Sequence, residues 1–145
     1  MMKYPIGIQS FEQLREDGYV YVDKTDLVYK LVTTGKIYFL SRPRRFGKSL
    51  LISTLENYFL GRRDLFEGLA ISSLEKEWLE YPVFHIDFNA GNFKESGILE
   101  GILEDTVSAW ESIYPPKFRF TSVGKRFQEV LRTAHEQTGR RCVVL

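Results

Sequence analysis

Residues 41–51, SRPRRFGKSLL, place four basic side chains within seven positions and then run into an apolar stretch. Phosphate-binding loops of the pattern GxxxxGK[ST] combine inward-facing backbone amides, a helix N-terminus and a lysine that meets the terminal phosphates. Gly47, Lys48 and Ser49 match the second half of that pattern. The spacing therefore predicts a nucleotide site in which Lys48 meets the β- and γ-phosphates and the Ser49 hydroxyl is a Mg²⁺ ligand.

The first half of the pattern departs from the usual form. Position 42 is an arginine instead of a glycine, and Pro43 has no amide N–H to donate. The cradle must therefore be made by the residues after Pro43, and Arg44 and Arg45 could partly replace a missing donor with charge. The residues that we predict to bind ATP, with Ser49 also holding Mg²⁺, are Arg44, Arg45, Phe46, Gly47, Lys48, Ser49 and Leu50. The alternatives are a solvated basic turn and a site for some other phosphate.

The segments on either side of the loop have the pattern that a phosphate loop requires. Residues 37–40, IYFL, form a short continuous apolar run, which is typical of a strand covered on both faces. After the loop, apolar residues recur at helical spacing, and we expect this helix to end near Gly61. The apolar positions are Leu51, Leu55, Tyr58 and Phe59.

The rest of the chain alternates expected helices with short expected strands. Capping residues and helical spacing predict helices after Ser10 and Asp23, over residues 99–114, and after Ser122. Runs of β-branched and aromatic residues predict strands at residues 19–22, at residues 82–88 and from Cys142. Such alternation predicts an α/β layered fold with a mainly parallel sheet.

The composition and the termini limit the class of protein. A chain of 145 residues is the size of one domain. Twenty Lys and Arg nearly balance nineteen Asp and Glu, so attraction to nucleic acid or an anionic membrane would need a local patch. The single cysteine cannot form an internal disulfide, which suits a reducing compartment. No signal-peptide core and no apolar run of ~20 residues is present, so we expect a cytoplasmic protein with no membrane partner.

The loop and residues 4–25, YPIGIQSFEQLREDGYVYVDKT, together resemble the bacterial AAA-ATPase-like proteins. In that family the ATPase part often precedes a C-terminal PD-(D/E)XK nuclease-like domain, and the Arg-Pro-Arg-Arg-Phe-Gly-Lys-Ser form of the loop is normal. The resemblance is strong over residues 4–59 and continuous in layout over residues 82–145. It implies a three-layer P-loop NTPase-like fold with ATP and Mg²⁺ as ligands, and it gives Lys48 and Ser49 their phosphate and metal roles. The Tyr21–Thr25 element is a family landmark, and its role does not follow from the residues.

The same resemblance implies that part of the ATPase lies beyond this sequence. In such ATPases the strand that begins CVVL continues into the Walker B acids, and this sequence ends at Leu145. We therefore expect residues 1–145 to be the N-terminal part of an AAA-ATPase-like P-loop domain, truncated after the start of the Walker B strand. Hydrolysis by this chain alone is not expected. Contact with nucleic acid would come through a missing C-terminal domain.

Two other classes of function remain open from the sequence. A nucleic-acid-binding module could use the basic groups at residues 62–63, 117–119, 125–126 and 140–141, although acids are interspersed with them. A protein-interaction remnant could self-associate through exposed sheet edges. A nucleotide site is expected to need Mg²⁺ and to saturate at one ligand per chain. Nucleic-acid binding would weaken steeply with salt.

Two weaker signals each have a plain structural interpretation beside the functional one. Asp87, near the end of an expected strand, could contact Mg²⁺ through water, although a carboxylate that caps the following loop is the commoner role. Ile6, Ile8 and Phe11 precede the loop strand and could form an apolar shelf for a nucleotide base. Core packing explains the same residues more simply.

Overall fold

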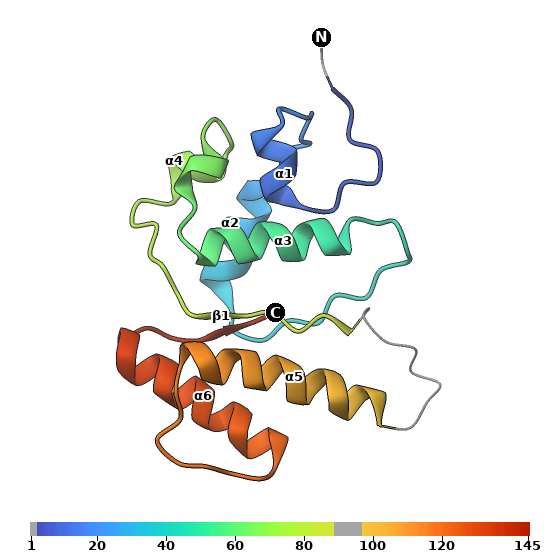
Figure 1. Cartoon of the computed structure of the whole chain (residues 1–145). Coiled ribbons are helices and arrows are strands. Elements are labelled where there is room, and N and C mark those ends of the chain that lie inside the picture. Colours follow the sequence, from blue (N-terminus) through green and yellow to red (C-terminus); the bar gives the residue numbers. More distant parts are fainter. Residues whose placement is uncertain (1–2, 89–96) are drawn as a thin grey trace. The chain divides into compact units, whose positions relative to one another are not determined.

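The structure, a computed structural model, describes residues 3–88 and 97–145 (Figure 1). The chain forms two compact units, Met1–Glu80 and Tyr81–Leu145. The predicted phosphate loop lies in the first of them.

The first unit is helical. Its first helix starts with local capping chemistry: the Gln13 amide donates to Ser10 Oγ at 3.2 Å, as the sequence predicts. The second helix ends before Gly35, and the helix after the loop ends just before Gly61, as predicted. The elements are α1 (Phe11–Glu16), α2 (Thr25–Thr34), α3 (Lys48–Phe59), the 3-10 helix η1 (Arg63–Phe66) and α4 (Ile71–Leu74).

Aromatic side chains fill the centre of the first unit. Phe11 of α1 and Phe66 of η1 are fully buried, with ring centroids 4.7 Å apart. Phe66 also packs against Trp78 at 5.1 Å and Tyr58 of α3 at 6.4 Å. The Phe11 amide donates to Ser53 Oγ of α3 at 2.9 Å, so α1 and the core together fix the helix that follows the loop.

The second unit contains a parallel strand pair and two long helices. The pair joins Val83 to Val143 and Phe84 to Val144. The Leu145 amide continues it by donating to the Phe84 carbonyl at 2.9 Å. The buried core consists of Phe84, Val107, Val130 and Ala134. The elements are β1 (Val83–Phe84), α5 (Ile98–Ile113), α6 (Val123–Thr138) and β2 (Val143–Val144), and the helices expected over residues 99–114 and after Ser122 are confirmed.

The predicted three-layer P-loop NTPase-like α/β fold with a mainly parallel sheet is wrong. The structure is mostly helical, and its one sheet within residues 3–88 and 97–145 has two strands, β1 and β2. The strand expected over residues 82–88 shortens to two residues, and the strand expected over residues 19–22 is reduced to an isolated bridge between Lys3 and Tyr19. Parallel pairing and the strand expected from Cys142 are retained, in β1 and β2.

The clearest difference concerns residues 37–40, which the sequence predicts as a buried strand. Ile37 and Phe39 are 94% and 93% exposed, and the segment makes no backbone hydrogen bond to any other described residue. Apolar β-prone residues favour a strand only where a neighbouring strand supplies hydrogen-bond partners and a covering layer supplies contacts. The described residues provide neither, so the segment remains irregular.

Candidate functional site

The predicted phosphate loop is an exposed segment that ends at the N-terminus of α3. Residues 41–47 are exposed, whereas Lys48 and Leu50 are half-buried. Two positions in the loop have left-handed backbone, Arg45 with φ 68° and Gly47 with φ 72°. A positive φ is uncommon for a residue other than glycine. Left-handed residues within a turn direct successive amides to one side, which is how proteins form anion-binding concavities.

The backbone amides of the loop are available to a ligand. Gly47 is the residue before α3 and offers no side-chain cap, and the first amide bond into the helix runs from Leu51 to the Gly47 carbonyl at 2.9 Å. The amides of residues 44–50 donate no hydrogen bond to any residue within the described ranges 3–88 and 97–145. Unpaired amides at a helix start can bind phosphate, because they combine free donors with the positive end of the helix dipole.

Lys48 reaches back over the loop. Its ammonium donates to the carbonyl oxygens of Arg42 and Pro43, the latter at 3.0 Å. The Lys48 side chain therefore links the start of α3 to the first residues of the loop. A phosphate oxygen is a stronger acceptor than a neutral carbonyl. The ammonium could therefore exchange these two carbonyls for an anion held by the neighbouring amides.

The loop offers little to a metal ion. Ser49 is exposed, and its hydroxyl makes no hydrogen bond within the described part of the chain. The nearest acids along the sequence are Asp26 and Glu56, and the described residues contain no group of three or more His, Cys, Asp or Glu that could hold a metal. Ser49 Oγ fits Mg²⁺ as a single ligand, so phosphate oxygens and water would have to complete the coordination.

Of the other residues that the sequence suggested for the site, two have positions that do not indicate a base-binding shelf, and Asp87 belongs to a different unit from the loop. Phe11 is fully buried in the aromatic core, which supports the packing interpretation over a shelf for a base, and Ile6 is 92% exposed. Asp87 follows β1 in the Tyr81–Leu145 unit, whereas the loop lies in the Met1–Glu80 unit.

The Tyr21–Thr25 element has a structural role that the sequence did not reveal. Asp23 Oδ1 accepts from the Thr25 amide at 2.9 Å and from the Thr25 hydroxyl at 2.7 Å. Asp23 Oδ2 accepts from the Ala70 amide at 2.7 Å, and Thr25 Oγ1 accepts from the Ile71 amide at 3.0 Å. Asp23 therefore accepts from the first amide of α2, and the two side chains also hold the first amides of α4. The sequence predicts Asp23 as the N-cap of α2, but Lys24 occupies that position and makes no side-chain cap bond, and no local pattern announces the link to α4.

Asp23 makes the stability of this unit depend on pH. Burial raises the pKa of its carboxyl group, but hydrogen bonds from Thr25 and Ala70 outweigh burial, so the net pKa is below its usual value. A carboxyl group with a lowered folded-state pKa stabilises the fold above its unfolded pKa, and this contribution is lost as pH falls through the folded value. We expect Asp23→Asn to reduce the free energy of unfolding by about 0.5–1.5 kcal/mol at pH 7, because Asn would face the Ala70 amide with its own NH₂ group, while water screens the lost charge of this exposed residue.

Denaturant titrations between pH 7 and pH 2 measure this effect. The variant should lose less stability than the wild type on acidification, so the two curves converge at low pH. Asp26→Asn is the matched control, because Asp26 is an exposed acid in the first turn of α2 with no hydrogen bond to the described residues. A constant difference between wild type and Asp23→Asn at every pH would contradict the role of the carboxylate charge.

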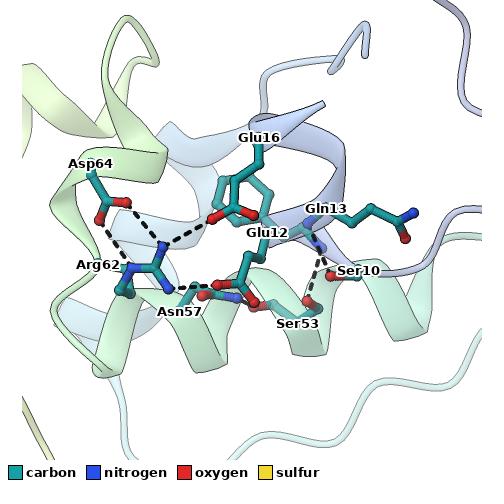
Figure 2. A network of polar contacts seen from close by, with 9 residues as sticks. Ser10, Glu12, Gln13, Glu16, Ser53, Asn57, Arg62 and Asp64 are labelled. Atoms are coloured by element: carbon teal, nitrogen blue, oxygen red, sulfur yellow. Dashed lines mark hydrogen bonds and ion pairs between the residues drawn. The ribbon is translucent and has the colours of Figure 1, made fainter. Parts of the chain in front are cut away.

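Several basic groups of the nucleic-acid hypothesis are neutralised within the fold. Figure 2 shows Arg62 between α1 and η1, where it pairs with Glu12 at 2.6 Å, Asp64 at 3.0 Å and Glu16 at 3.3 Å. Hydrogen bonds to Asp64 and Glu12 raise the pKa of Arg62 above its usual value. Other ion pairs join Arg126 to Glu104 and Glu111, Lys117 to Glu136, and Arg132 to Glu129 and Glu136. The arginines of the loop, in contrast, form no ion pair with a described residue.

A pocket in the second unit has the wrong chemistry for phosphate. A pocket of about 180 Å³ is lined by apolar residues of α5 and α6, among them Leu103, Trp110 and Phe127. None of its lining residues is charged, and the Thr106 hydroxyl already donates to the Ile102 carbonyl at 2.6 Å. The loop before α3 is therefore the better candidate for a phosphate ligand.

Comparisons with known proteins agree with the family resemblance of the loop. A family model described as "Predicted AAA-ATPase" matches residues 5–145. A curated relative, the "Uncharacterized protein in vnfD 5'region" of Azotobacter chroococcum mcd 1, is 41% identical over 144 residues. The match covers 99% of this chain and 28% of that relative, so the chain spans little more than a quarter of the relative's length. No solved structure matches the chain. Among the described residues, no helix has the length and apolarity needed to cross a membrane.

Proposed function

Because this chain belongs to the predicted AAA-ATPase family, we propose that residues 44–50 bind the phosphates of ATP or ADP. Residues 1–145 would then be the N-terminal part of an AAA-ATPase-like P-loop domain. The observation that carries the proposal is the run of unpaired amides over residues 44–50, which ends at a helix N-terminus with a lysine folded over it. That combination of donors suits a phosphate chain and has no use in the packing of the unit.

Each residue has a distinct role in the proposed site. The amides of Phe46, Gly47 and Lys48 would donate to the phosphate oxygens, and Gly47 would let the backbone approach them without a Cβ. Lys48 would exchange its two carbonyl partners for the terminal phosphates. Ser49 would present its hydroxyl to Mg²⁺, which would supply positive charge to the phosphates. Arg44 and Arg45 would add positive charge at the edge of the loop.

The proposal is one of binding. Hydrolysis requires a group that orients or activates the attacking water. Residues 27–55 contain no Asp or Glu that could act in this way beside the loop. Turnover by the longer family members is therefore a separate question from binding by this chain.

Calorimetric titration of MgATP into the folded wild-type chain tests the proposal. We expect saturable binding with one ligand per chain. Circular dichroism should first establish that the chain is helical, as α1–α6 require. Absence of any binding by a helical, monodisperse chain would refute the proposal.

Nucleic-acid binding is the second candidate, and one observation favours it. Arg42, Arg44 and Arg45 are exposed and form no ion pair with a described residue. Titration of a single-stranded oligonucleotide at 50 and 200 mM salt separates the two candidates. Binding through several phosphate contacts would weaken by orders of magnitude over that range. Our proposal expects the oligonucleotide to bind far more weakly than MgATP at the higher salt.

A further inference from the structure

The loop and the residues beside it carry a local excess of positive charge, with no acid close by in the sequence. Residues 27–55 contain six Lys or Arg and no Asp or Glu, although the whole chain has a net charge of only +1. The basic residues are Lys30, Lys36, Arg42, Arg44, Arg45 and Lys48. A patch of one sign on a nearly neutral protein attracts anions locally.

Several arginines elsewhere in the fold are paired with acceptors, whereas those of the loop are not. Arg62, Arg126 and Arg132 each pair with at least two carboxylates. Arg15 donates to the backbone carbonyls of Leu65 and Glu67, both at 2.7 Å. The three loop arginines have no such acceptor among the described residues, and they flank the amides that also lack one.

The same loop provides almost nothing for a divalent cation. At the helix start, Ser49 is the residue whose side chain carries an oxygen atom. No acid lies between Asp26 and Glu56 in the sequence. In a nucleotide site, Mg²⁺ neutralises phosphate charge, and here arginine and lysine side chains are positioned to do so instead.

We propose that this chain binds the phosphate chain of a nucleotide directly, through Arg44, Arg45, Lys48 and the loop amides, without needing Mg²⁺ for affinity. The inference rests on the proposed function and departs from the sequence-based expectation that binding needs Mg²⁺. Ser49 can still contact Mg²⁺ when the ion arrives with the nucleotide. The ion then contributes little to affinity, because the loop cations already neutralise the phosphates.

The test compares ATP and inorganic tripolyphosphate, each titrated calorimetrically in excess EDTA and in excess MgCl₂ at matched ionic strength. We expect ATP to bind in EDTA at least as tightly as in MgCl₂, and tripolyphosphate to bind and to compete with ATP. The double variant Arg44→Gln/Arg45→Asn should lose about tenfold or more in affinity in EDTA, and less in MgCl₂. Asparagine is chosen at position 45 because it tolerates the left-handed backbone found there.

Arg63→Gln is the matched control. Arg63 lies beyond the C-terminal end of α3, is exposed, and makes no side-chain hydrogen bond or ion pair with the described residues. Its replacement removes one positive charge, half of what the double variant removes, far along the chain from the loop, so affinity in EDTA should stay within about twofold of wild type. A loss of affinity in this control equal to that of the double variant would mean that net charge alone drives binding. It would overturn the assignment to Arg44 and Arg45.

The remaining outcomes separate this inference from the proposed function. Binding of ATP in MgCl₂ but not in EDTA would overturn the inference and leave the proposed function standing. If neither ATP nor tripolyphosphate binds, in EDTA or in MgCl₂, the inference and the proposed function are both refuted. Oligonucleotide binding that tripolyphosphate cannot displace would overturn both in favour of nucleic-acid recognition.

Discussion

Replacement of Lys48 by alanine is expected to reduce MgATP affinity by about a hundredfold or more, which removes saturable binding under ordinary titration conditions. The ammonium would donate charge-assisted hydrogen bonds to phosphate oxygens, and each such bond contributes about 1.5–3 kcal/mol. Alanine also removes the link from Lys48 to the carbonyls of Arg42 and Pro43, so the loop loses its closure as well as its cation.

Alanine is a suitable replacement because it is the best helix former, and α3 should still begin at position 48. Lys125→Ala is the matched control, because Lys125 is an exposed lysine of α6, outside the basic segment of residues 27–55, whose side chain has no hydrogen bond to the described residues. It should bind MgATP as the wild type does. Unchanged affinity in Lys48→Ala would mean that this lysine does not contact the ligand. It would contradict the assignment of Lys48 as the main phosphate-binding side chain of the loop.

The second large effect concerns stability. We expect Phe66→Ala to reduce the free energy of unfolding of the Met1–Glu80 unit by about 3–5 kcal/mol. Phe66 is fully buried, and its ring lies against Phe11 at 4.7 Å, Trp78 at 5.1 Å and Tyr58 at 6.4 Å. Truncation would leave a cavity among aromatic rings that belong to α1, α3 and the segment after α4. These rings are too large to close the space by small shifts.

Trp78 fluorescence during urea unfolding can measure this loss, in a background with Trp110→Phe. The chain has two tryptophans, one in each unit, so this background reports the first unit alone. Phe46→Ala is the control, because it deletes the same atoms from a side chain that is 63% exposed. Its effect on stability should stay within about 0.5 kcal/mol. A loss below about 1 kcal/mol for Phe66→Ala would show that Phe66 is not central to the core.

The helices could be predicted from sequence because their signals are local. Ser10 caps α1 by accepting from the Gln13 amide, and Gly35 and Ser122 directly flank α2 and α6, so each signal lies within one turn of the helix that it limits. The strands could not be predicted in the same way, because a strand depends on partners distant in the chain. β1 is a strand only where it meets β2, sixty residues later, and the equally apolar residues 37–40 have no such partner among the described residues.

The residues of the candidate site could be predicted from the sequence, but their geometry could not. The run from Arg44 to Leu50 is contiguous, so its motif places the residues together whatever the surrounding fold. The unpaired amides and the contact of Lys48 with Pro43 depend on backbone geometry at Arg45 and Gly47, and no residue pattern specified the left-handed conformation of an arginine. The link from Asp23 to Ala70 spans 47 residues. Like the strand pairing, it could not be predicted from the sequence, because its partners are distant in the chain.

That link has a consequence for the way in which the first unit opens. α4 has four residues, and an isolated helix of that length would fray. Its first amides are instead held by Asp23 and Thr25, which precede the loop and α3 in the chain. Unwinding of α4 would therefore break the two hydrogen bonds that join it to Asp23 and Thr25 at the start of α2. The segment that carries the loop lies in the chain between these two linked helices, so loss of the link would remove a restraint on both ends of that segment.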